Sequence, residues 1–297
     1  MKVAVTGAGG LLGGAVLRSL IAAGNEVIAL SSSLDFNADL EGFRWDAKQD
    51  PMLTSHFLHG VEVLVHAGAY IPSHHYDFEE ATKCIEVNAI GTLNLLRASE
   101  LARVRRFIYV SGSNLLSPRS DLIREDDPVG CQYSPYYLGS KVLGEIYVRA
   151  RMARGMDGLI VRPSSIYGPG MKSGVICSFV DRIRKGLPIT LKDGGNFQAD
   201  FVWRDDVASL LCDAVRSKQV GEVNLGSGQA NNLCTLARLL VNIFEADENL
   251  IHYSQVRSES LARGFSAVDI SRAREWFNFN PITLNNGLVR WFQESVL

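Results

Sequence analysis

The sequence predicts a doubly wound α/β protein, in which helices cover both faces of a parallel sheet. Two observations predict this class. In the first half of the chain, near-continuous apolar runs alternate with segments whose apolar residues recur at helical spacing. A glycine-rich turn also follows the first of these runs and opens the first helical segment. Together they indicate a repeated β-α-β order around one parallel sheet.

The apolar runs are predicted strands because parallel strands are buried on both faces and lack an alternating pattern. They are Lys2–Thr6, Glu26–Leu30, Val61–His66, Arg106–Ser111 and Gly158–Arg162, with a shorter run at Gly42–Trp45. Three helices are predicted between them. Leu11–Ala23 is followed by a glycine in the C′ position, and Ile85–Ala102 has helical apolar spacing. Ser134, as N-cap, and Pro135 open a third helix that runs to about Arg154.

From Tyr167 onward, Gly-Pro-Gly and similar turn signals surround one short predicted helix, Val175–Lys185, which we assign to a smaller lobe. We expect Phe201–Trp203 and the helix Asp205–Val215 to return to the main sheet. Two further segments complete the expected order: a strand and turn at Val223–Gly226, and a helical remainder with a loop, Leu233–Leu297.

Composition excludes several classes of protein. The chain of 297 residues is long enough for a full core and a second lobe, and its 46% hydrophobic and 21% charged residues exclude a disordered polymer. The net charge of −2 gives no reason to expect nucleic acid or an anionic membrane as a partner. No apolar run approaches the roughly 18 residues of a membrane span.

The cysteines and histidines do not indicate a disulfide framework or a metal site. The five cysteines are far apart and never form a C-x-x-C pair, so we interpret them as reduced core thiols. His56 with His59 and the pair His74-His75 have ligand-like spacing, but no cysteine or carboxylate constellation joins them, and we assign no metal. These features favour the cytoplasm.

The glycine-rich turn reads GAGGLLG over residues 7–13. Gly7 allows the tight turn, Gly10 lets the backbone approach a pyrophosphate at the positive end of the helix, and Gly13 lets helix and strand pack closely. This context predicts a dinucleotide site. The residues of this turn predicted to contact the dinucleotide are Gly7, Gly10, Leu11, Leu12 and Gly13.

The second strand ends in Ser31 and Ser32, which we predict to contact the cofactor. An acidic residue there would accept from the ribose 2′-OH and repel a 2′-phosphate, and a cation would attract it. Neither is present, so NAD and NADP are both physically allowed, with NAD favoured. Asp46 follows the short third strand, and it either meets the adenine edge or is a solvated loop aspartate.

Tyr137 and Lys141 are four residues apart, so both project from one face of the third helix. The lysine charge favours phenolate, and we expect it to lower the tyrosine pKa toward the working pH. Such a pair also arises by chance on a solvated helix. Ser113, just past the end of a strand, either donates to the oxygen that Tyr137 protonates or is an ordinary turn serine.

These motifs resemble the extended short-chain dehydrogenase/reductases, also called the NAD-dependent epimerase/dehydratase family, over nearly the whole chain. The glycine turn and the Tyr137–Lys141 pair carry the resemblance together with His66–Ala69, Asn88 in Val87–Thr92, Val110–Ser113, Arg162-Pro163, Tyr167–Gly170, Asp200–Val207 and Asn224–Gly228.

The resemblance implies roles for particular residues. Tyr137 is the expected acid/base, Lys141 binds the nicotinamide ribose, Ser113 orients the substrate oxygen, and Asn88 supports the lysine side of the site. Further implied cofactor contacts are Ala67, Gly68, Ala69, Ser111, Tyr137, Lys141, Pro163 and Ile166. It also implies a homodimer formed through the helices that hold Asn88 and Tyr137.

The resemblance further implies a Rossmann domain of residues 1–165 and 199–226, with a smaller mixed substrate-binding lobe of residues 166–198 and 227–297. Two departures from the family pattern restrict the substrate. Ser165 and Ala199 stand where relatives acting on nucleotide sugars commonly have an asparagine and an arginine, which weakens the case for a diphosphate. The cations that could substitute are Lys172, Lys192, Arg204, Arg257 and Arg263.

The pair Asn114-Leu115 stands where 4,6-dehydratases of the family have an Asp-Glu pair, so that elimination chemistry is not expected. The leading hypothesis is an NAD(P)-dependent oxidoreductase or epimerase that transfers hydride at a secondary alcohol or ketone of a polar, sugar-like substrate. One alternative is a nucleotide-sugar 4-epimerase with tightly bound NAD. A second is a non-catalytic dinucleotide-binding sensor.

Overall fold

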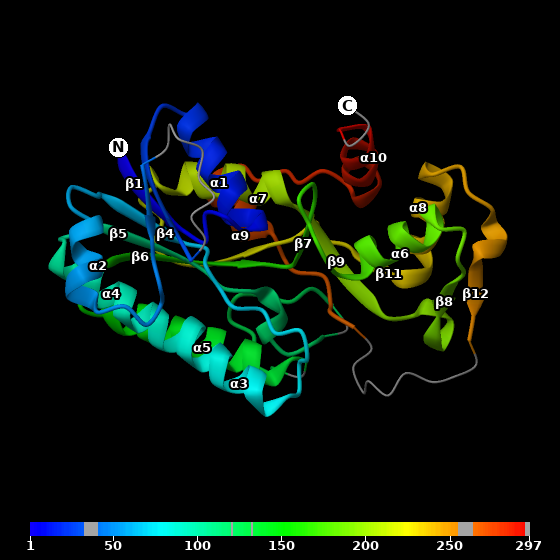
Figure 1. Ribbon diagram of the computed structural model, residues 1–297, viewed down its shortest axis with the longest axis horizontal. Coiled ribbons are helices and arrows are strands. Elements are labelled where there is room, and N and C mark those ends of the chain that lie inside the picture. Colours follow the sequence, from blue (N-terminus) through cyan, green and yellow to red (C-terminus); the bar gives the residue numbers. More distant parts are fainter. Residues whose placement is uncertain (33–40, 120, 132, 255–263, 295–297) are drawn as a thin grey trace.

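The computed structural model describes residues 1–32, 41–119, 121–131, 133–254 and 264–294 (Figure 1). Within these ranges, seven parallel strands form the central sheet in the order β10-β6-β5-β4-β1-β2-β3. The strands are β1 (Lys2–Thr6), β2 (Glu26–Ser31), β3 (Gly42–Arg44), β4 (Val63–His66), β5 (Arg106–Val110), β6 (Asp157–Pro163) and β10 (Gly221–Leu225). The chain order reverses between β1 and β4, which confirms the predicted doubly wound class.

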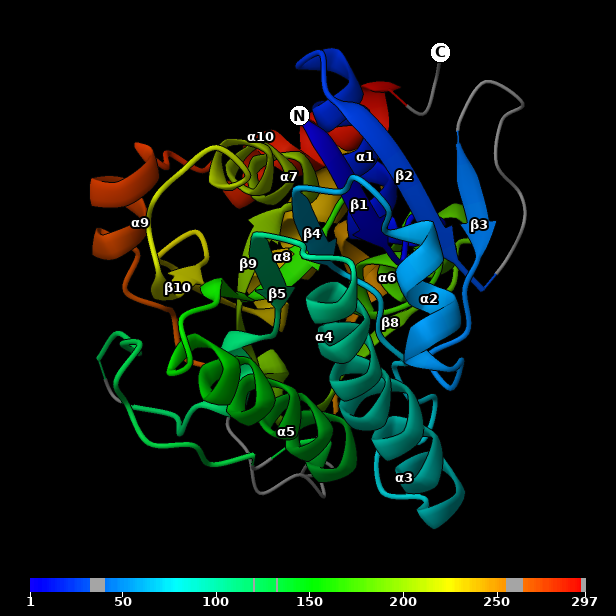
Figure 2. The same ribbon diagram turned by 90° about the vertical axis from the view of Figure 1, so that its left-hand side faces the viewer.

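Helices cover both faces of this sheet, as Figure 2 shows. One face carries α1 (Leu11–Ala22) and α7 (Arg204–Ala214), which pack on each other, with α9 (Ser271–Phe277) beside them. The other face carries α2 (Pro51–Phe57), α4 (Gly91–Leu101) and α5 (Pro135–Met152). Every helix in the described ranges is too short or too polar to span a membrane.

Alternate side chains of each strand enter opposite cores, as the pleat of a strand requires. Val3 and Val5 of β1 pack in the core under α1 and α7, whereas Ala4 packs with Leu64, Phe107 and other residues in the core under α4. Both cores are apolar, which is why the strands show no alternation in the sequence.

The helix predicted over Ile85–Ala102 begins earlier than expected, because α3 (Phe78–Cys84) continues through a π-helical turn, Ile85–Ile90, into α4. Its start is set by Asp77, whose carboxylate accepts a hydrogen bond from Glu79 N–H at 3.0 Å. The aspartate before two glutamates was a local signal for this start.

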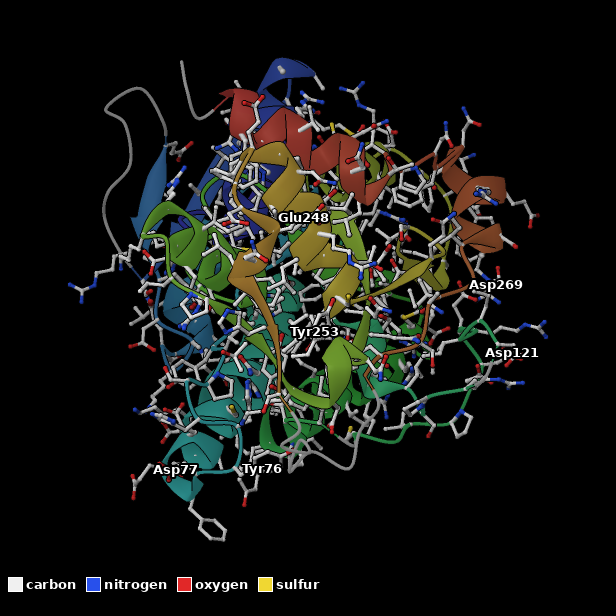
Figure 3. All side chains as sticks on the ribbon, turned by 90° about the vertical axis from the view of Figure 1, so that its right-hand side faces the viewer. Tyr76, Asp77, Asp121, Glu248, Tyr253 and Asp269 are labelled. Atoms are coloured by element: carbon white, nitrogen blue, oxygen red, sulfur yellow. The ribbon has the colours of Figure 1, made fainter. Side chains whose placement is uncertain are left out.

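The smaller lobe has a three-stranded sheet of β7 (Ser165–Tyr167), β9 (Gln198–Trp203) and β11 (Ala230–Asn232), and a pair of β8 (Ile189–Leu191) with β12 (Ile251–Tyr253). Its helices are α6 (Val175–Arg184), α8 (Leu233–Ile243) and α10 (Leu284–Glu294). Figure 3 looks onto this lobe, with Tyr253 of β12 and Glu248 just before that strand on its outer layer.

Two predictions for this region are wrong. Phe201–Trp203 does not return to the main sheet: β9 pairs with β7 and β11, and Phe201 and Trp203 pack with Tyr167 in a separate core. The helix after it, α7, packs on the main domain, and Val202 of β9 also enters the main core. The remainder from Leu233 is not wholly helical, since it contributes β12. The proposed domain boundaries stay a prediction.

A chain of buried hydrogen bonds ties the middle of the sheet to α4. Gly68 N–H donates to Thr6 Oγ1 at 3.1 Å, and Thr6 Oγ1 lies 2.6 Å from His66 Nδ1. On the other side of the ring, His66 Nε2 lies 3.0 Å from Thr92 Oγ1, which donates to Asn88 O. The bonds are all satisfied when the neutral imidazole carries its proton on Nε2.

A buried ion pair joins α5 to β6. Glu145 accepts two hydrogen bonds of 2.8 Å from the Nε and Nη2 of Arg162, and both side chains are at most 2% exposed. Arg149 adds a third bond to Glu145, and Arg162 Nη1 donates to Glu125 O at 2.7 Å. Burial acts to raise the pKa of Glu145, but Arg162 outweighs it and holds that pKa below its ordinary value.

We predict that Glu145→Ala lowers the free energy of unfolding by about 3–5 kcal/mol, because it leaves the Arg162 charge buried without its partner. Urea unfolding measures this difference. The matched control is Asp181→Ala, which breaks an exposed i, i+4 pair with Lys185 and is expected to cost less than about 1 kcal/mol. Equal effects of the two substitutions would contradict the prediction.

We also predict that His66 makes stability depend on acid pH. Burial, reinforced by the charge of Lys141, lowers the pKa of His66 from 6.5 to about 3. Between these values the unfolded chain binds the extra proton, so the stabilisation is present above pH 6.5 and is lost as the pH falls, by up to about 1.4 kcal/mol per pH unit. Urea unfolding of His66→Gln across this window should show a shallower slope, and identical slopes would refute the assignment.

Candidate active site

A cavity of about 1180 Å³ lies where the central strands end at their carboxyl edge. Its wall contains every residue that the sequence predicted to contact the cofactor: Gly7, Gly10, Leu11, Leu12, Gly13, Ser31, Ser32, Asp46, Ala67, Gly68, Ala69, Ser111, Tyr137, Lys141, Pro163 and Ile166. The loops after β1, β2, β4, β5 and β6 all reach this edge, because the strands are parallel. Residues far apart in the chain therefore share one wall.

The glycine turn is packed too tightly for side chains. Gly7 has a φ of +68°, and a Cβ there would lie 2.6 Å from the Cα of Gly68. A Cβ on Gly13 would lie 2.1 Å from the carbonyl oxygen of Gly7. Among the described residues no side chain caps α1 at Gly10, and the first residues of the helix, Leu11–Gly13, line the cavity. The geometry suits a phosphate anion.

Tyr137 and Lys141 line the cavity from the first turns of α5. Lys141 is 2% exposed, and its Nζ lies 4.3 Å from the centroid of the Tyr109 ring. Burial lowers the pKa of Lys141 to about 7, and the charge of Glu145 opposes this effect. The ammonium is therefore held in an enclosed, poorly solvated place.

Two expectations about this helix are wrong. Burial raises the pKa of Tyr137 to about 12, which is opposite in direction to the expected lowering. The reason is that enclosure penalises both the phenolate and the ammonium. Ser134 does not cap the helix through its side chain: it has a left-handed backbone, and its hydroxyl lies 2.8 Å from His75 Nδ1.

Asn88 and Ser113 lie behind the cavity wall. Asn88 sits in the π-helical turn, where Oδ1 accepts from Tyr70 N–H at 2.7 Å and Nδ2 donates to Tyr70 O and to Ser140 Oγ. It thus fixes the loop after β4 and the residue next to Lys141. Ser113 is 1% exposed in a short 3₁₀ turn, and its neighbour Asn114 lines the cavity instead.

Sequence reasoning missed some residues of the wall. Arg18 lines the cavity from α1, two turns after Leu11 and on the same helix face, a spacing that could have identified it. Tyr70 was not missed, since the sequence offers it among the aromatic residues that could line a substrate cleft; it lines this cavity, with its hydroxyl donating to Glu80 at 2.5 Å. Asp46 does line the cavity, while its carboxylate also accepts from Lys48 N–H at 2.9 Å.

The two family departures lie together in a second cavity of about 270 Å³, which Ser165 and Ala199 both line. Of the cations considered as substitutes, Lys172 and Arg204 line the larger cavity. The Arg204 guanidinium already bonds to Asp205 and to Pro169 O. Lys192 lines neither cavity, and Arg257 and Arg263 lie outside the described residues.

Comparison with known proteins supports this geometry. The chain is 28% identical over 322 residues to a UDP-glucose 4-epimerase of Mycolicibacterium smegmatis, covering 98% of this chain and 97% of that protein. Among solved structures, MoeE5 in complex with UDP-glucose and NAD has a TM-score of 0.86 at 23% identity, with 100% of both chains covered.

The structure of DesIV, a dTDP-glucose 4,6-dehydratase from Streptomyces venezuelae with NAD and TYD bound, has a TM-score of 0.86 at 25% identity and covers 99% of this chain and 97% of that one. A family model described as the NAD dependent epimerase/dehydratase family matches residues 3–226. With the glycine turn, the Tyr-Lys pair and the doubly wound sheet all in place, this chain belongs to the NAD dependent epimerase/dehydratase family.

Proposed function

We propose that the protein is an NAD-dependent oxidoreductase or epimerase that transfers hydride at a secondary alcohol or ketone of a polar, sugar-like substrate. One observation carries the proposal: the dinucleotide-binding residues and the Tyr137–Lys141 pair line a single cavity at the switch point of the sheet. NAD supplies the hydride acceptor or donor when bound. The complexes of MoeE5 and DesIV, both of which hold NAD, support the choice of cofactor.

Different residues of the cavity wall would bind different parts of the dinucleotide. The glycine turn and the start of α1 would hold the pyrophosphate, Ser31 and Ser32 the adenosine ribose, and Lys141 the nicotinamide ribose. A polar end of β2 without a carboxylate also admits NADP, and Arg18 in the same wall would favour a further phosphate. We propose NAD as the cofactor, and titration with both dinucleotides tests it.

The Tyr137 phenol is the proposed proton carrier at the reacting oxygen. With its pKa raised to about 12 it is protonated at neutral pH, so it can donate its proton to an alkoxide that forms from a carbonyl. The Lys141 ammonium on the next turn would stabilise the phenolate left behind. Asn88 would act from behind the wall, by positioning the loop after β4. Ser113 is the proposed donor to the reacting oxygen, although it does not line the cavity in this structure.

The two alternatives differ in what happens to the cofactor. A nucleotide-sugar 4-epimerase would retain NAD and show no net redox change, and the Mycolicibacterium relative favours it. A sensor would bind the dinucleotide without turnover. The acid/base pair stands in the cavity wall, which favours an enzyme over a sensor.

The homodimer and the compartment also belong to this proposal. Large apolar side chains are exposed on α3, the π-helical turn and α4, among them Phe78, Ile90 and Leu93, and Ile146 is exposed on α5. Figure 2 shows α3, α4 and α5 next to one another. Such a patch on adjacent helices suits an isologous contact between two copies.

All five cysteines are free thiols, which suits the proposed location in the cytoplasm.

We predict that Tyr137→Phe lowers kcat by about 10²–10⁴-fold and leaves dinucleotide affinity unchanged, because only the proton carrier is removed. The control is Tyr136→Phe, a neighbour that does not line the cavity.

Mass spectrometry of the denatured, purified protein identifies the cofactor first. Stoichiometric NAD supports an epimerase cycle, reversible binding supports a dehydrogenase or reductase, and binding of neither dinucleotide would overturn the proposal.

For the dimer, we predict that light scattering finds about twice the chain mass of 32.6 kDa and that Leu93→Glu restores the single mass. A carboxylate in the centre of an apolar contact is left without a partner. Leu187→Glu is the control, because Leu187 is equally exposed but lies in the loop before β8. A wild-type protein that is monomeric at micromolar concentration would exclude this interface.

A further inference from the structure

The second cavity adjoins the first and extends it into the smaller lobe. Its volume is about 270 Å³, and Ile166 and Met171 line both cavities. Protein interiors contain few voids larger than a water molecule, so a space of this size next to a reaction cavity is characteristic of a binding site. Apart from Ile166, no predicted cofactor contact lines it, and neither Tyr137 nor Lys141 does.

The wall of this cavity is apolar and largely aromatic. It consists of Tyr133, Ser165, Ile166, Tyr167, Met171, Val175, Ile176, Phe197, Ala199, Phe201, Leu233 and Phe265. The Phe265 ring meets Tyr133 at 5.5 Å and Phe197 at 5.7 Å between ring centroids, both nearly edge to face. Rings held in this way form a rigid, preorganised wall.

Polar groups in the wall are few. Among the described residues that line the cavity there is no Lys, Arg, His, Asp or Glu. The Tyr167 hydroxyl is already engaged with Leu284 O at 3.3 Å, which leaves Ser165 and Tyr133 as the other side chains with hydroxyl groups. A diphosphate needs charge-assisted donors, and the described residues of this wall offer none.

We propose that the second cavity binds an uncharged, apolar group of the substrate, a single aromatic ring or a short alkyl chain, while the polar reacting end lies at Tyr137. This inference rests on the proposed function, because it places the reacting oxygen in the larger cavity. The shared Ile166 and Met171 connect the two ends of such a molecule. Ala199, a small residue on β9, leaves the room that the apolar group would fill.

The test is a series of 1-hydroxy-2-alkanones from four to eight carbons, together with 1-hydroxy-4-phenyl-2-butanone, reduced with NADH. All share one polar ketone head and differ only in the tail. We expect kcat/KM to rise roughly threefold for each added methylene, since each one is removed from water. A flat series with measurable turnover would overturn the inference and leave the proposed function intact.

Two variants locate the effect. Ala199→Leu fills the cavity and should abolish the rise of kcat/KM with tail length. Ala230→Leu is the matched control, since Ala230 lies on the neighbouring strand β11 and does not line the cavity. Phe265→Ala enlarges the cavity and should favour the longest tails, so the proposal remains testable if Ala199→Leu does not fold.

A binding measurement separates this inference from the function it rests on. Calorimetric binding of the eight-carbon compound should weaken at least tenfold in Ala199→Leu whether or not the compound is reduced. No turnover with any ketone, but binding that depends on Ala199, would refute the proposed function and support the cavity assignment. No binding, or competition by UDP at micromolar concentration, would overturn the inference.

Discussion

The buried pair of Glu145 and Arg162 fixes the helix on which the candidate chemistry depends. It joins α5 to β6, and α5 is the element that carries Tyr137 and Lys141 to the edge of the sheet. Two charges withdrawn from water are stable only when their hydrogen bonds are complete, and here Arg149 and Glu125 O complete them. The orientation of the helix is thereby restricted to one that satisfies all these groups.

Burial also controls the ionisation of the two side chains proposed to carry the chemistry. Lys141 Nζ lies over the Tyr109 ring, and burial there lowers the pKa of its ammonium. Burial also raises the pKa of the Tyr137 phenol. Because the pKa of Lys141 is about 7, the charge of the pair responds both to pH near neutrality and to a charged ligand that enters the cavity. At the glycine turn, a Cβ on Gly7 would clash with the backbone of Gly68, so this part of the wall tolerates no side chain at Gly7.

The sequence predicted the sheet and its edge because both follow from local patterns. Apolar runs marked the strands, and parallel order brought their carboxyl ends together, which is why the predicted cofactor contacts all line one cavity. The partners of β9 could not be predicted, since short strands choose neighbours by tertiary packing. The direction of the Tyr137 pKa shift and the second cavity depend on burial by residues from Tyr133 to Phe265, and no spacing rule contains that information.

The positions of the cavity residues along the chain affect the order in which the two cavities can form during synthesis. Among the described residues, those that line the larger cavity come no later in the chain than Arg204, whereas the second cavity is also lined by Leu233 and Phe265. Because a chain emerges from the ribosome N-terminus first and folds in units, the dinucleotide site can assemble while the last quarter is still being synthesised. Cofactor captured at that stage would stabilise the nascent domain by mass action before any substrate site exists.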